Sequence, residues 1–165
     1  MLEPILNELQ QEAATTRRLL ERIPGDKLSW KPHVKSMSLG QLALHVATIP
    51  ESICHLAQLD EFDASAADFV AAAPNSRDEI LARLDRSVST AAAYLTALTP
   101  EQTGAAWRLT LRGSELSVIP RADMLRSLML NHWYHHRGQL SVYLRLLDVP
   151  IPVIYRRSAD ENPFA

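Results

Sequence analysis

Two histidines stand four residues apart in the segment that runs from Asn131 to Leu140. A helix advances about 100° per residue, so His132 and His136 would lie about 40° apart on one helix face. Leu125 and Tyr143 fall on the same face, and we therefore predict that both imidazoles point inward. Two imidazoles at positions i and i+4 can converge on one metal ion, as they do in the helical motif of zinc proteases.

A third candidate ligand lies in another predicted helix. His45 shares its helix face with aliphatic side chains, so we predict that it also points inward. Three neutral imidazoles are a common ligand set for a transition metal, and they leave coordination positions for water or substrate. The sequence therefore predicts an open divalent-metal site at His45, His132 and His136, with zinc, nickel, iron and manganese as alternatives.

The other histidines are weaker candidates. His135 falls about 60° from His132 on the opposite flank, where it is the one nearby candidate for a general base. His55 lies about 80° from His45, and His33 lies in a loop beside a proline. The alternative for the three inward histidines is a metal-free protein in which each is a hydrogen-bonded core residue.

The elements that must position these residues are helices. Four stretches repeat apolar residues at steps of three and four, which is typical of amphipathic helices: 2–23, 38–59, 76–98 and 121–147. Ser38 with Gln41 and Ser76 with Glu79 match the capping-box pattern at two of the helix starts. The four stretches predict an all-α protein, a four-helix bundle formed by one domain over residues 1–165.

The connections carry fewer signals. We predict loops over 27–37 and 61–75, the second with a turn of helix, and an irregular tail from Asp148. Residues 107–119 alternate with period two around a Gly-Ser pair, which predicts a short hairpin or extended crossover before the last helix. Pro50 cannot donate to the Val46 carbonyl, so we predict a kink or break in the second helix.

Composition excludes several classes of protein. The net charge is −2, from 17 basic and 19 acidic residues, whereas a general nucleic-acid binder is normally basic. The sequence contains no run of about 18 apolar residues, which a membrane-spanning helix would need. The single cysteine, Cys54, excludes an intrachain disulfide and fits a reducing compartment, and the N-terminus has no signal-peptide pattern, so we expect a cytoplasmic protein. Nucleotide-binding and serine-hydrolase motifs are absent.

Two blocks of sequence resemble the DinB-like family of metal-binding four-helix bundles. They are Leu39–Ala47 and Asn131–Leu140, and the similarity continues through Ser141–Leu147 and Pro150–Pro152. The resemblance implies an up-and-down bundle with a long crossover before the last helix, and often a homodimer. It also implies a divalent metal held by one histidine of the second helix and two of the last, which carry over to His45, His132 and His136.

The resemblance does not select one reaction. Some relatives look like transferases or isomerases that use a low-molecular-weight thiol, and others look like hydrolases, so we expect a metal-dependent enzyme acting on a small molecule. The alternative is a non-catalytic metal-binding or stress-response module. Around the site, Gln139 could hydrogen-bond a ligand imidazole. We expect Arg137 to pair with an acidic residue and Cys54 to pack in the core.

Overall fold

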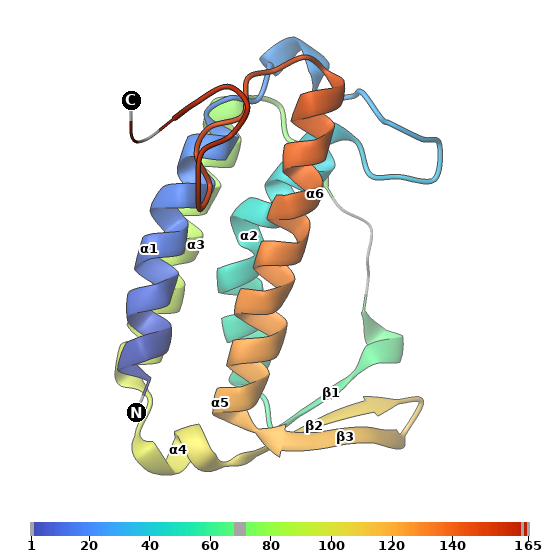
Figure 1. Cartoon of the computed structure of the whole chain (residues 1–165). Helices are drawn as coiled ribbons and strands as arrows, with labels where there is room; N and C mark the ends of the chain where they lie inside the picture. Colours follow the sequence, from blue (N-terminus) through green and yellow to red (C-terminus); the bar gives the residue numbers. More distant parts are fainter. Residues whose placement is uncertain (1, 68–71, 163, 165) are drawn as a thin grey trace.

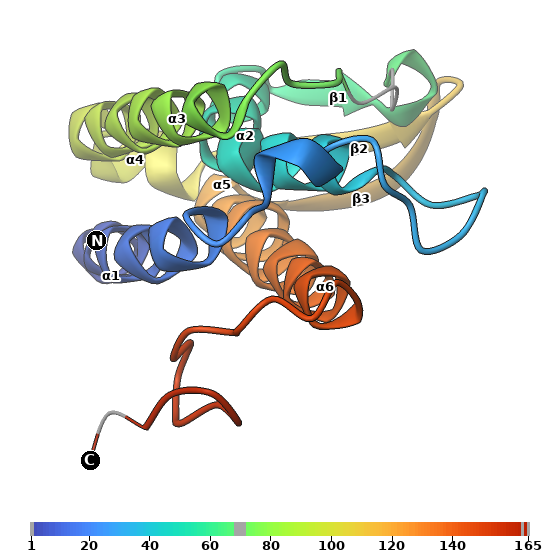
Figure 2. The same cartoon turned by 90° about the horizontal axis from the view of Figure 1, so that it is seen from above.

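A computed structural model describes residues 2–67, 72–162 and 164 of the chain. It is mostly helical, and its longest elements lie alongside one another (Figure 1): α1 (Glu3–Leu20), α2 (Leu39–Ala57), α3 (Arg77–Ala97) and α6 (His132–Leu146). Helix α2 packs against both α3 and α6, and α1 packs against α3. The view along the helices shows α6 beside α2, with the C-terminal tail on the outside (Figure 2).

The predicted capping boxes form to different extents. The Ser38 hydroxyl accepts a hydrogen bond from the Gln41 amide, and the Gln41 side chain accepts one from the Ser38 amide, which completes the box at the start of α2. At α3 the Ser76 hydroxyl accepts from the Glu79 amide. The Glu79 carboxylate accepts from the backbone and side-chain amides of Asn75 instead of returning to Ser76.

We predicted a kink or a break at Pro50, and helix α2 continues through this residue without a break. The carbonyl that proline leaves without its helical donor, that of Val46, accepts a hydrogen bond of 2.7 Å from the indole N–H of Trp133. One residue after the proline, the Glu51 amide donates to the hydroxyl of Ser87 on α3, at 2.9 Å. Neighbouring helices therefore supply hydrogen-bond partners on both sides of the proline.

A small sheet makes the all-α prediction incomplete. Its strands are β1 (Glu61–Asp63), β2 (Ala106–Leu111) and β3 (Ser114–Pro120), in the order β1-β2-β3. Of the two predicted alternatives, a hairpin or an extended crossover, strands β2 and β3 form the hairpin, which is antiparallel. It follows the short helix α4 (Pro100–Gly104) in the connection before the last helical run. Strand β1 pairs parallel to β2 and lies in the predicted loop 61–75, of which residues 68–71 are outside the described part of the chain.

Strand β1 is fixed by its last residue. The hairpin turns through Arg112 and Gly113, whose positive φ angles of 51° and 77° suit a two-residue turn. Both of their amides donate to the Asp63 carboxylate at 3.1 Å. The Ser65 hydroxyl and then the Ser65 amide contribute most to lowering the pKa of Asp63 to about 2, and the amides of Arg112 and Gly113 contribute less. A three-residue strand without a hydrophobic pattern is therefore held by a contact that joins distant parts of the sequence.

The last helical run is not uniform. It begins with α5 (Arg121–Met124), passes through a π-helical segment (Leu125–Asn131) and continues as α6. A π-helical turn takes more residues than an α-helical turn, so positions on either side of it are not related by 100° per residue. The predicted single α-helix over 121–147 is correct in extent and wrong in its regular winding.

No helix in residues 2–67 or 72–162 has both the length and the apolar character needed to cross a membrane.

Candidate metal centre

The structure brings together the three histidines that the sequence selected. The ring centroid of His136 lies 4.5 Å from those of His45 and His132, and the other two centroids are 5.2 Å apart. Each residue offers a ring nitrogen, and these three nitrogens all lie within 4.8 Å of one another. Helices α2 and α6 therefore present a compact set of three imidazole donors, which suits zinc and the neighbouring divalent transition metals.

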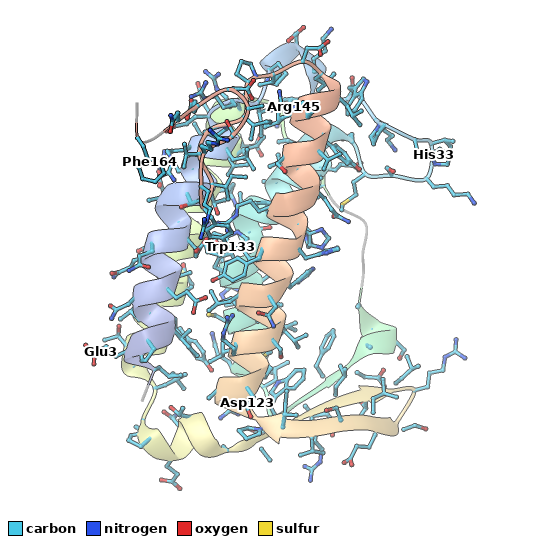
Figure 3. All side chains as sticks on the ribbon, viewed as in Figure 1. Glu3, His33, Asp123, Trp133, Arg145 and Phe164 are labelled. Atoms are coloured by element: carbon cyan, nitrogen blue, oxygen red, sulfur yellow. The ribbon has the colours of Figure 1, made fainter. Side chains whose placement is uncertain are left out.

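The other histidines stay outside this cluster. His33 extends on the loop before α2 (Figure 3), and His55 is exposed on α2. The ring of His135 lies 4.9 Å from that of His136, but its side chain is exposed on the outer side of α6. His135 is therefore a neighbour of the triad that faces solvent.

We predicted that His132 and His136 lie on the buried face of α6, and this prediction is wrong. That face is formed by Trp133, Arg137, Leu140 and Leu144, and Figure 3 shows Trp133 pointing away from solvent toward the other helices. His132 and His136 are half-buried on the adjacent flank of α6, and His45 on α2 is also half-buried. One reference residue of the helical wheel, Leu125, lies in the π-helical segment, and this irregular winding rotates it relative to α6.

Two hydrogen bonds orient the rings of the α6 pair. The Gln139 side-chain oxygen lies 2.7 Å from Nδ1 of His136 and can only accept, so Nδ1 carries the proton and Nε2 keeps its lone pair. The Leu128 carbonyl accepts a hydrogen bond from the His132 ring. Such partners fix the tautomer and orientation of metal-binding histidines. The Gln139 contact was a sequence hypothesis; the contact with Leu128 was missed, because it depends on the backbone of the π-helical segment.

The electrostatics keep the triad neutral. Burial, together with smaller contributions from the neighbouring His136 and His132, lowers the pKa of His45 to about 4. Burial is also the main cause of the lowered pKa values of His132 and His136. A metal ion needs unprotonated imidazoles, so the site is ready for a divalent cation at neutral pH.

This shift predicts how the metal-free protein responds to acid. The ordinary pKa of histidine is 6.5, so between pH 6.5 and about 4 the unfolded chain binds more protons than the folded one at His45. The contribution of His45 to the free energy of unfolding is fully present above pH 6.5 and is lost as the pH falls toward about 4. Urea unfolding at a series of pH values measures this slope.

The control is His45→Gln, which removes the titrating ring and leaves the carboxylates of the protein in place. Its free energy of unfolding is expected to fall less steeply than that of the parent between pH 6.5 and about 4. Equal slopes in the two proteins would contradict the predicted burial of a neutral imidazole at this position.

Other residues singled out in the sequence have structural contacts. Cys54 is buried with its sulfur 3.8 Å from that of Met129, and burial raises its pKa to about 12, so it is an unreactive packing residue as predicted. Arg137 pairs with Glu12 at 2.5 Å, as expected. The Tyr143 hydroxyl donates to the Met37 carbonyl at 3.3 Å, which joins α6 to the loop before α2.

Comparisons with known proteins agree with this architecture. The model of the DinB family matches residues 1–162. Among solved structures, a DinB-like protein from Bacillus cereus superimposes with a TM-score of 0.72 at 22% identity, over 93% of this chain and 97% of that one. A DinB-like protein from Bacillus subtilis gives 0.70 at 21% identity, over 94% and 100% of the two chains.

A third solved structure, of a candidate DinB family member from Exiguobacterium sibiricum, gives a TM-score of 0.66 at 24% identity, over 91% and 94% of the two chains. No curated protein matches the sequence significantly. The solved structures share the fold across almost their whole length, and at these identities they carry no information about the reaction.

Proposed function

Because the chain belongs to the DinB family, we propose that it is a metal-dependent enzyme acting on a small molecule, either a hydrolase or a thiol-dependent transferase. The observation that carries this proposal is the cluster of His45, His132 and His136, whose donor nitrogens lie within 4.8 Å of one another. A bound divalent ion would supply Lewis acidity, which lowers the pKa of a coordinated water or thiol.

The geometry supports an open site more than a closed structural one. Structural zinc sites are usually filled by four protein ligands, whereas catalytic sites have three and keep a position for water or substrate. The three imidazoles are half-buried, so the ion would lie at the edge of the helical assembly, within reach of a small molecule. In this proposal the four long helices form a bundle, and the reaction takes place at its edge, at the ion held by α2 and α6.

The residues around the triad have separate tasks in the proposal. Gln139 holds the His136 ring in the tautomer whose Nε2 faces the ion. His135 is exposed beside His136 and is placed to exchange protons between the site and solvent. The low pKa of His45 keeps its imidazole unprotonated, and therefore able to bind the ion, while His135 exchanges protons.

An exchangeable coordination position is the property that separates an enzyme from a non-catalytic metal module. We expect the absorption spectrum of the cobalt-substituted protein to change when a low-molecular-weight thiol or imidazole is added, because either can enter the open position. The His33→Ala/His55→Ala variant, which removes two histidines outside the triad, should respond as the parent does. A spectrum that neither ligand changes would show a closed site and would overturn the proposal.

The same titration distinguishes the two reaction classes. A thiolate–cobalt charge-transfer band that saturates at low thiol concentration would favour the transferase, because the thiol is then a co-substrate. A response to imidazole without such a band would favour the hydrolase, in which the open position is reserved for water.

A further inference from the structure

Trp133 lies between the two metal-ligand candidates of α6 and contacts the backbone beside the third. Its side chain is fully buried, and its indole N–H donates to the carbonyl of Val46 at 2.7 Å. Val46 directly follows His45 on α2, and Trp133 directly follows His132 on α6. One hydrogen bond therefore connects the two helices at the level of the triad.

The carbonyl is available because of Pro50. In a regular helix the Val46 carbonyl accepts from the amide four residues later, and proline has no amide hydrogen. In a helix the ring of a proline also clashes with the carbonyl four residues before it. Val46 is fully buried, so no solvent replaces the lost donor, and the indole of Trp133 satisfies the acceptor instead. Pro50 and Trp133 act together across the interface between α2 and α6.

We propose that Trp133 is a positioning residue of the metal centre. Its hydrogen bond to the Val46 carbonyl fixes the spacing and register of α2 against α6, and so holds His45 where it can share one ion with His132 and His136. This inference rests on the metal function proposed above. Metal–nitrogen bonds are about 2.0–2.1 Å long, so a small shift between the helices removes one ligand from the set.

A second tryptophan in the same chain provides a matched control. The indole of Trp107 is also buried and also donates to a carbonyl of α2, that of Leu56, at 3.3 Å. Leu56 lies 11 residues beyond His45, or about 16 Å along the helix, because each residue rises 1.5 Å. Trp107 therefore makes the same kind of contact with α2 without reaching the triad.

The test compares the Trp133→Phe and Trp107→Phe variants. Each loses an indole N–H and some buried volume, so each is expected to unfold at a lower urea concentration than the parent when metal-free. Only Trp133→Phe should bind cobalt and zinc more weakly, by about 10- to 100-fold in Kd measured by chelator competition, as is typical for loss of an outer partner of a metal site. Its cobalt spectrum should also change, which a loss of stability alone would not cause.

Pro50→Ala keeps the test decisive if Trp133→Phe does not fold. This substitution restores an amide that competes with the indole for the Val46 carbonyl, and it leaves Trp133 in the core. We expect the same direction of change in Kd as for Trp133→Phe, with a smaller size, and no change of Kd in Trp107→Phe.

The outcomes separate this inference from the proposed function. If the parent binds metal and Trp133→Phe and Pro50→Ala bind it as tightly as Trp107→Phe does, the positioning role is wrong and the metal function stands. If the parent binds no metal after loading with zinc and cobalt, the proposed function is wrong and the positioning role falls with it.

Discussion

Replacing His132 and His136 together by alanine is expected to abolish metal binding. The parent should hold close to one divalent ion per chain after loading, measured by elemental mass spectrometry, and the double variant should hold almost none. The physical reason is that one imidazole, His45, would remain from a set whose nitrogens lie within 4.8 Å. A single neutral donor cannot replace the hydration shell of a divalent ion.

Metal binding should also appear as a gain in stability. A ligand that binds only the folded state at 100 times its Kd raises the free energy of unfolding by about 2.7 kcal/mol. We expect a gain of this size for the zinc-loaded parent in urea unfolding and none for His132→Ala/His136→Ala. The His33→Ala/His55→Ala variant is the matched control, because it removes the same number of histidines outside the triad. Metal content that follows the number of histidines removed, whichever they are, would contradict the site.

Replacing Arg137 by methionine is expected to cost about 3–5 kcal/mol of the free energy of unfolding, as is typical when one partner of a buried ion pair is removed. The guanidinium is 2% exposed and pairs with Glu12 at 2.5 Å, and it also donates to the Thr16 hydroxyl at 3.1 Å. Tyr134 and Tyr155 place their rings 5.2 Å from it. The variant would leave the Glu12 carboxylate, itself only 13% exposed, without its counter-charge.

The control lies on the same helix. Arg145 pairs with Asp160 at the same distance of 2.5 Å, but its side chain is 48% exposed, so Arg145→Ala should lower the free energy of unfolding much less than Arg137→Met does. The double variant Glu12→Met/Arg137→Met should recover much of the stability lost in Arg137→Met, because apolar residues can replace a buried pair. Urea unfolding of the parent and the three variants measures these losses and the recovery. Equal losses in Arg137→Met and Arg145→Ala would show that burial does not set the cost.

The sequence predicts only an irregular tail from Asp148, and it does not indicate partners for Asp160 and Glu161. In the structure Asp160 accepts from the Ile151 amide and pairs with Arg145, and Glu161 pairs with Arg22 of the segment after α1. Sequence alone could not place them, because their partners lie on elements that are distant along the chain.

The sequence by itself determined the local features. The extents of the helices follow from apolar periodicity, the start of α2 from the Ser38–Gln41 capping box, and the hairpin from its period of two. The pair His132 and His136 also needs only the helix repeat, since residues four apart are neighbours on any α-helix. These features depend on interactions between residues that are close in the chain, which the sequence contains directly.

The tertiary structure decided which helix face is buried and what holds it. Arg137 is a charged residue in the sequence, and it lies in the core because Glu12, 125 positions earlier, is there to pair with it. Trp133 faces inward, and its indole N–H supplies the donor that a buried carbonyl of α2 lacks because of Pro50. The π-helical segment before His132 breaks the regular phase on which a helical wheel depends. Long-range partners of this kind fix the rotation of α6, and that rotation places the histidines on the flank.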